Sequence, residues 1–134
     1  MDKRFFTVLE ANELIPFLTD RLQRIGSIYQ GLRATADRHA PKLQDILVRG
    51  GIPVHHGYLE LVGRMQGLTT EICAQGCHIK DPECGLVDFP TIWKGREVYL
   101  CWKLGEDEVG FWHEIDAGFA GRQPLKQPSP EDKS

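Results

Sequence analysis

The sequence lacks any apolar run that could cross a membrane. A transmembrane helix needs about 20 predominantly apolar residues in succession, and no stretch of this chain approaches that length. The first residues, MDKRFFTVLEANEL, also lack the apolar core of a secretory signal. We therefore expect a cytoplasmic protein that has no membrane partner.

A concentrated basic patch is also missing. Residues 1–76 contain nine Lys/Arg and eight Asp/Glu, whereas residues 77–134 contain seven Lys/Arg and eleven Asp/Glu, so the two parts carry net charges of +1 and −4. A protein that binds nucleic acid normally concentrates positive charge on one surface. The charge distribution therefore disfavours a nucleic-acid partner.

Several motifs that identify enzymes and cofactor sites are absent. No phosphate-binding loop, Rossmann glycine pattern, serine elbow or C-x-x-C pair occurs. The four cysteines of a cytoplasmic protein should be reduced. A disulfide framework is therefore not expected, and a role as small buried hydrophobic residues explains the cysteines better than zinc binding does.

The first half of the chain shows helical periodicity. Thr7 and Glu10 fit a capping box at a helix N-terminus. An apolar stripe with spacings of three and four follows at Leu14, Leu18, Leu22, Ile25, Tyr29 and Leu32. We expect helix over about residues 8–37, with a kink or a new segment at Pro16.

A second helical stripe follows the connection at residues 49–53. It consists of Tyr58, Leu61, Met65, Leu68 and Ile72. Gly76 stands where a glycine commonly ends a helix. The two stripes should face each other, so residues 1–76 are predicted to form a long antiparallel helical hairpin.

The helices also carry features that point to self-association. The apolar face of the first helix is wider than one helical partner would cover, because it also includes Ile15, Phe17, Ile25 and Ile28. A second copy of the chain is the simplest cover, so we expect a homodimer. The glycines Gly57, Gly63 and Gly67 of the second helix are either tolerated surface residues or places where a partner helix approaches closely.

After Gly76 the apolar pattern alternates, as in strands. Residues 77–122 are predicted to form a small antiparallel β-sheet of about four strands, at residues 77–80, 86–89, 97–104 and 109–115. Pro90 should end the second of these strands. Residues 123–134 are rich in Pro, Lys, Ser and acidic residues and are expected to be a disordered tail. The fold class is therefore α+β.

The last two strands can be paired by taking residues 105–108 as the turn. The pairs are then Leu104 with Val109, Trp102 with Phe111, Leu100 with His113, and Val98 with Ile115. All members but His113 are apolar, so this should be the buried face, and a slip of one residue would reverse both faces. His113 is then either a hydrogen-bonded buried histidine or a ligand.

Acidic residues occupy the other face in this register. Asp116 lies opposite Glu97, and like charges so placed destabilise a strand pair. Because Gly118 and Gly121 let the chain turn back, we predict a salt bridge from Arg122 to one of these carboxylates. The arginine either fixes the loop or also binds an anionic ligand. The candidate ligand-binding residues are Asp88, Glu97, His113, Glu114, Asp116 and Arg122.

A metal site is a weaker interpretation. Zinc could use the side chains of Cys77, His78, Cys84, Cys101 and His113. However, the neighbours Cys77 and His78 would point to opposite faces of a strand. A nucleophilic Cys101 assisted by His113 is weaker still, because the expected register separates them on opposite faces. We therefore expect no metal and no other cofactor.

Several segments resemble one known family. They are TVLEANELIP (7–16), IKDP (79–82), GLVDFP (85–90), GREVYLCWKLGE (95–106) and GFWHEIDAGFAGRQPL (110–125), which are similar to the domain-of-unknown-function 2203 family of bacterial proteins. The resemblance implies that the chain matches the family signature at Asp88, Trp102, His113, Asp116, Gly118, Gly121 and Arg122. It implies no particular activity.

Two functional hypotheses follow. The first is a non-enzymatic, self-associating module that binds a protein or a small ligand. The alternative is an enzyme or a metal-binding protein that uses the region of His113, Glu114, Asp116 and Arg122. Clustered polar side chains in a pocket would favour the second hypothesis, and an apolar patch on the helices would favour the first.

Overall fold

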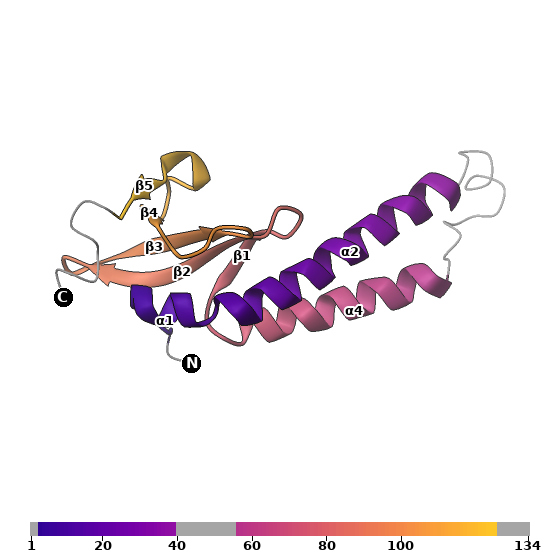
Figure 1. Ribbon diagram of the computed structural model, residues 1–134, viewed down its shortest axis with the longest axis horizontal. Helices are drawn as coiled ribbons and strands as arrows, with labels where there is room; N and C mark the ends of the chain where they lie inside the picture. Colours follow the sequence, from indigo (N-terminus) through magenta and orange to yellow (C-terminus); the bar gives the residue numbers. More distant parts are fainter. Residues whose placement is uncertain (1–2, 40–55, 126–134) are drawn as a thin grey trace.

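The computed structural model describes residues 3–39 and 56–125, which form helices followed by an antiparallel sheet (Figure 1). The helices are α1 (Val8–Glu13), α2 (Ile15–His39) and α4 (His56–Cys73). The strands are β1 (His78–Asp81), β2 (Leu86–Trp93), β3 (Arg96–Lys103), β4 (Phe111–His113) and β5 (Gln123–Pro124), and a 3-10 turn, η1 (Phe119–Gly121), precedes β5. The α+β class is confirmed, and the sheet has five strands in the order of the sequence rather than about four.

The expected capping box begins α1. The Thr7 side chain accepts a hydrogen bond from the Glu10 amide at 3.1 Å, and the Glu10 carboxylate accepts one from the Thr7 amide at 2.9 Å. The helix stops at Leu14, and Pro16 then lies in the first turn of α2, where a missing N–H costs nothing. The prediction of a new segment at Pro16 is confirmed.

Helices α2 and α4 lie side by side and run in opposite directions (Figure 1). The side chain of Leu61, a member of the predicted second stripe, lies against α2 at Gly31. The expected connection at residues 49–53 lies outside the described residues, so the hairpin itself is not described. No helix in residues 3–39 or 56–125 is long and apolar enough to cross a membrane.

One face of the sheet forms the core with the helices. Its strand residues are Val87, Phe89, Val98, Leu100, Trp102 and Trp112, and its helical residues include Ala11, Leu18, Leu22, Ile25 and Ile72. Phe6, which precedes α1, places its ring 5.2 Å from that of Phe89 in an edge-on contact. Trp102 is fully buried, as expected, but it lies opposite Val87 and not opposite Phe111.

Pro90 does not end β2, as the sequence interpretation expected. The strand continues to Trp93, with Pro90 opposite Tyr99. The Pro90 carbonyl accepts a hydrogen bond at 2.7 Å from Phe6, which lies outside the sheet. The amide nitrogen and carbonyl of one strand residue point to the same side, so the N–H that proline lacks would face this edge and not β3. Proline is tolerated at such positions.

The expected register of the last hairpin is wrong by one residue. Strand β4 pairs Phe111 with Cys101, Trp112 with Leu100, and His113 with Tyr99. It also begins later and ends earlier than expected, and β5 pairs with it at Gln123 and Pro124. The sheet therefore extends into the segment expected to be a tail, of which residues 126–134 lie outside the described part.

A buried Asp–Cys–His cluster as the candidate site

Three chemically active side chains meet on the sheet face that is turned away from the helical core. Asp88 and Cys101 are cross-strand partners of β2 and β3. His113 of β4 follows on the same face because its partner is Tyr99. The exposed fractions of Asp88, Cys101 and His113 are 1%, 0% and 2%, and one ligand atom from each lies within 4.8 Å of the others. We call these three residues the Asp–Cys–His cluster.

The hydrogen bonds of His113 show which ring nitrogen carries a hydrogen. Its Nδ1 lies 2.7 Å from the carbonyl oxygen of Glu114, which can only accept, so Nδ1 carries a hydrogen. Its Nε2 lies 3.0 Å from Oδ1 of Asp88. Either a proton or another cation must lie between this nitrogen and the carboxylate, because two lone pairs would otherwise face each other.

The second oxygen of the Asp88 carboxylate, Oδ2, is buried and has no hydrogen-bond partner among the described residues. A buried polar atom without a partner is rare in folded proteins and usually indicates an ion, a water molecule or a functional role. The described residues therefore leave one oxygen of the cluster, Oδ2 of Asp88, without a hydrogen-bond partner.

Cys101 is held as a neutral thiol. Burial, together with the nearby negative charge of Asp88, raises the pKa of its thiol to about 12. The thiolate is the reactive form, so Cys101 is a poor nucleophile at neutral pH. The prediction that Cys101 and His113 lie on opposite faces is wrong, because it depended on the register that the structure corrects.

Arg122 holds the segment after β4 against the sheet face that carries the Asp–Cys–His cluster. Its guanidinium donates hydrogen bonds to both carboxylate oxygens of Glu106, at 2.8 and 2.9 Å. It also stacks on Phe111 and Phe119, at 3.9 and 4.7 Å from the two ring centroids. In Figure 1 this segment, η1 and β5, lies on the side of the sheet opposite to α1. Arg122 thus connects the last strands to the turn after β3.

The predicted partners of Arg122 are wrong. Glu97 forms an ion pair with Lys3, and Asp116 is exposed at the surface. Glu114 pairs with Arg96 instead. The sequence interpretation places Glu106 in a turn and misses it as the partner of Arg122. Of the six candidate residues, the structure brings together only Asp88 and His113, and it adds Cys101.

The remaining candidates for a metal site are not part of the cluster, and two of them lie apart from it. Cys77 is buried and its thiol donates to the Ile72 carbonyl at 3.4 Å. Cys84 is exposed in the turn between β1 and β2. His78 is exposed as well, but it lies opposite Asp88 in the β1–β2 pair, and its ring lies 6.0 Å from that of Tyr99. The structure therefore separates Cys77 and Cys84 from the cluster, whereas His78 lies beside Asp88 without belonging to the group of ligand atoms within 4.8 Å.

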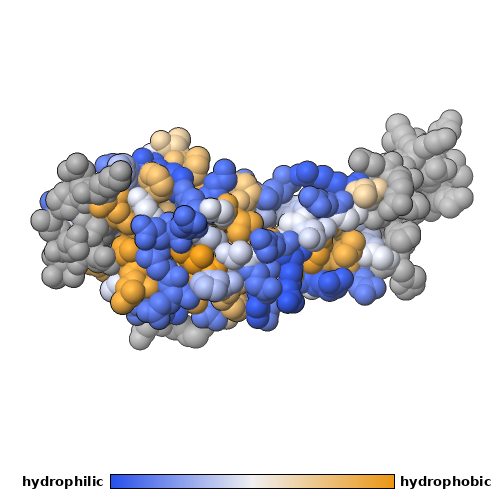
Figure 2. All heavy atoms as spheres, in the orientation of Figure 1, coloured by the Kyte–Doolittle hydropathy of each residue, from blue (hydrophilic) through white to orange (hydrophobic). Residues whose placement is uncertain are grey.

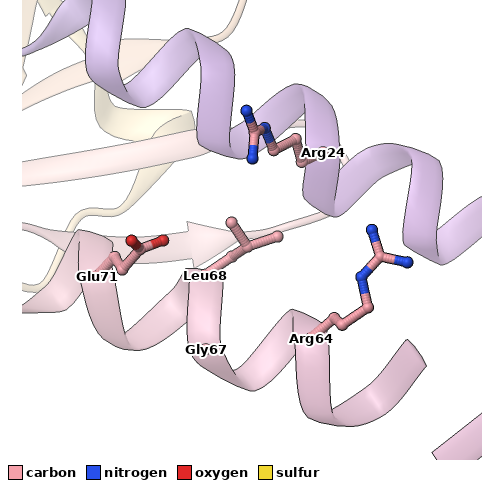
Figure 3. Close-up of a pocket in the computed structure, with 5 residues that line it drawn as sticks. All are labelled: Arg24, Arg64, Gly67, Leu68 and Glu71. Atoms are coloured by element: carbon pink, nitrogen blue, oxygen red, sulfur yellow. The ribbon is translucent and has the colours of Figure 1, made fainter. Parts of the chain in front are cut away.

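An open hollow also lies between α2 and α4 (Figure 3). It is lined by Arg24, Arg64, Gly67, Leu68 and Glu71. Arg24 is engaged by Asp20 one turn earlier on α2. In Figure 3 the side chains of Arg64 and Leu68 reach from α4 toward α2. These residues are exposed or half-buried, and they lie on helices rather than on the sheet face that carries the cluster.

The sequence matches a family model described as "Uncharacterized conserved protein (DUF2203)" over residues 4–125. The chain belongs to this family. The match includes both the helices and the sheet, so the Asp–Cys–His cluster and Arg122 lie inside the DUF2203 region. Neither a search of curated proteins nor a search of solved structures found a match.

Proposed function

We propose that this DUF2203 protein is a non-enzymatic binding module that associates with a second copy of itself through α2 and α4. The observation that carries the proposal is the incomplete burial of α4. Leu61, Met65 and Leu68 of its apolar stripe are only half-buried, and Leu59 is 57% exposed. A soluble helix normally buries such a stripe against another element.

The position of α2 and α4 explains this exposure. Both helices extend away from the sheet, so no further element packs on their distal part in the described chain (Figure 1). Figure 2 shows apolar side chains at the surface along the seam between the two helices as well as over the sheet. A second helical pair would supply the missing layer, as in a four-helix arrangement.

The surface that we propose differs from the one that the sequence indicates. Ile25 and Ile28 are 0% and 4% exposed within the chain, so they are already covered. A second exposed surface is the line formed by Leu59, Gly63 and Gly67, which are spaced by four residues on α4. It lies on the side of α4 opposite to Leu61, which contacts α2, so a partner helix could pack here without displacing α2. Among the described residues, no atom lies within 4 Å of a Cβ built at either glycine, so a partner helix has room to approach the backbone.

The state of the cluster supports binding rather than catalysis. Its three members are buried, the Cys101 thiol is neutral at physiological pH, and both ring nitrogens of His113 are engaged. Arg122 is committed to Glu106. In the proposed enzymatic region, His113 contacts Asp88, Glu114 pairs with Arg96 and Arg122 pairs with Glu106. Asp116 is exposed, so these four side chains do not converge on one another in the described structure.

We further propose that the protein acts in the cytoplasm, with α2 and α4 as a helical hairpin and without a nucleic-acid partner. All four cysteines are free. A reducing compartment maintains that state. The acidic balance of residues 77–134 supports the absence of nucleic acid from the proposed partners.

Sedimentation at micromolar concentration tests the association. The wild-type protein should be a dimer, and Leu59→Lys should weaken it by roughly tenfold or more, because each symmetric interface would contain the charge twice. Leu9→Lys is the matched control, since Leu9 is a 69% exposed leucine of α1. A wild-type monomer, or equal dissociation constants for the two variants, would overturn the proposal.

A further inference from the structure

We propose that Asp88, Cys101 and His113 bind one divalent metal ion of the zinc class. Their three ligand atoms, a carboxylate oxygen, a sulfur and an imidazole nitrogen, lie within 4.8 Å of one another on strands β2, β3 and β4. This site goes beyond self-association, because it lies on the sheet and not on α2 or α4. It would be a structural site that joins three strands.

His113 is oriented as a metal ligand. Its Nδ1–H donates to the Glu114 carbonyl, so the lone pair of a neutral ring would lie on Nε2, the nitrogen that faces Asp88. Histidines that bind metals commonly donate their other ring N–H to a backbone carbonyl or a carboxylate, which holds the ring in place. The hydrogen bond to Glu114 supplies this second contact.

Asp88 needs a positive partner. A carboxylate that is 1% exposed is expensive to bury unless its charge is compensated. In residues 3–39 and 56–125 the ion pair of Asp88 is with His113, which is charged only if it is protonated, and Arg122 is bound to Glu106. A metal ion would take the place of that proton. A metal ion beside Asp88 would also give its unpaired Oδ2 a partner, either directly or through a bound water.

The donor set and the spacing select the metal. A combination of nitrogen, sulfur and oxygen ligands suits zinc and similar transition metals, whereas magnesium and calcium prefer oxygen alone. Tetrahedral zinc with bonds of about 2.0 to 2.3 Å places its ligand atoms roughly 3.3 to 3.6 Å apart. The Nε2 to Oδ1 distance of 3.0 Å is already near this range. Other pairs, at up to 4.8 Å, would close by about 1 Å.

The two reasons against zinc were the missing C-x-x-C pair and the opposite faces of Cys77 and His78, and neither applies to this cluster. The register that separated Cys101 from His113 counted against a nucleophilic cysteine, and the observed register places both residues on the same face. Asp88 was not expected beside either residue. Three strands, and not a local motif, assemble this set of ligands.

Cobalt binding tests the site in the full-length chain. Cys73→Ser and Cys84→Ser first remove the two exposed thiols, which could bind metal on their own. This parent protein is unfolded, treated with a chelator to remove metal, and refolded with Co²⁺. Metal binding must release the proton of the Cys101 thiol to solvent, because the thiolate is the ligand. We expect one Co²⁺ per chain with a thiolate-to-cobalt charge-transfer band, and Zn²⁺ should displace it. Asp88→Asn should weaken cobalt binding by at least tenfold.

Two cysteine variants of the parent make the test specific. Cys101→Ser should abolish the band, whereas Cys77→Ser should keep it, because Cys77 is equally buried but lies outside the cluster. A parent that refolds to its native circular dichroism spectrum without the band overturns the proposal, as does a band that persists in Cys101→Ser. If a variant does not fold, a second measurement on the parent protein tests the proposal. Its thermal midpoint should rise by several degrees when Zn²⁺ is added and fall again with chelator.

Discussion

At the scale of single residues, Arg122 makes more tertiary contacts than its sequence position indicates. Its side chain is 13% exposed, donates twice to Glu106 and lies between two phenylalanine rings. A guanidinium can make planar stacking and a two-pronged hydrogen bond at the same time, whereas an ammonium cannot. The structural form of the Arg122 hypothesis is thus supported, with a different carboxylate as the partner.

Arg122→Lys should lower the free energy of unfolding by roughly 1.5 to 3 kcal/mol, the range for hydrogen bonds to charged groups. The control is Arg96→Lys, because Arg96 is 51% exposed in its pair with Glu114. Exposed ion pairs contribute about 0 to 1 kcal/mol, so this change should be small. Urea denaturation of both variants measures the difference. Equal losses would show that the stacked contacts of Arg122 add nothing.

Cys77 gives a prediction for the dependence of stability on pH. Burial raises the pKa of its thiol from 9.0 to about 11. Between these values the unfolded chain loses the proton and the folded chain keeps it, so stability must fall as pH rises, at up to about 1.4 kcal/mol per pH unit. Below pH 9 this contribution is fully present. Denaturation at a series of pH values should show a shallower decrease for Cys77→Ala. The same slope in both proteins would contradict the assignment.

At the scale of elements, the hairpin between β2 and β3 sets the position of the cluster. Lys94 and Gly95 form its two-residue loop and both have positive φ, 52° and 78°. This combination is typical of the turns that best match the twist of two strands. Pairing outward from Trp93 and Arg96 then places Asp88 opposite Cys101. The loop could therefore have identified this pair from the sequence.

Gly95→Ala should destabilise the protein by about 1 kcal/mol, because alanine is strained at positive φ. The space around Gly95 is open, so no steric clash adds to this cost. Gly26→Ala is the matched control with the opposite sign. Gly26 lies inside α2 with equally open space, and alanine favours a helix by up to about 1 kcal/mol over glycine. Thermal unfolding should separate the two variants, and destabilisation by both would contradict this account of Gly95.

At the scale of the whole molecule, the two proposed sites lie on different parts of the chain. The association surface belongs to α4, and the Asp–Cys–His cluster belongs to strands of the sheet, on the face away from the helical core. Sites that share no partners usually contribute independently to free energy. The cluster and the helices should therefore respond separately to substitution.

Because the two sites are separate, a variant of one site should not change the property measured for the other site. Leu59→Lys, introduced into the cobalt-binding parent, should leave the affinity for Co²⁺ unchanged within about twofold, because its effect is confined to α4. Cys101→Ser should likewise leave the dissociation constant of the dimer unchanged. Titration with Co²⁺ and sedimentation supply the measurements. If either variant changes both properties, the two surfaces are coupled, and the independence proposed here is wrong.

Local signals in the sequence determined the elements of this protein. The capping box at Thr7, the break at Pro16 and the helical stripes act over a few residues, so periodicity and local chemistry are sufficient to predict α1, α2 and α4. The family resemblance is likewise confirmed over residues 4–125. The β2–β3 register was not predicted, because the second strand was expected to end at Pro90, although the two-residue loop at Lys94 and Gly95 fixes the pairing.

Only the tertiary structure decided where His113 lies. A turn of four residues predicts one register, but residues 104–110 separate β3 from β4, and contacts from elsewhere shape this loop. Asn12 of α1 accepts a hydrogen bond from the Val109 amide at 2.7 Å, and the Trp102 indole donates to the Glu106 carbonyl at 2.9 Å. These contacts set β4 one residue away from the expected pairing, and a one-residue shift reverses the faces of a strand. His113 therefore joins Asp88 and Cys101, because distant residues hold the loop that precedes it.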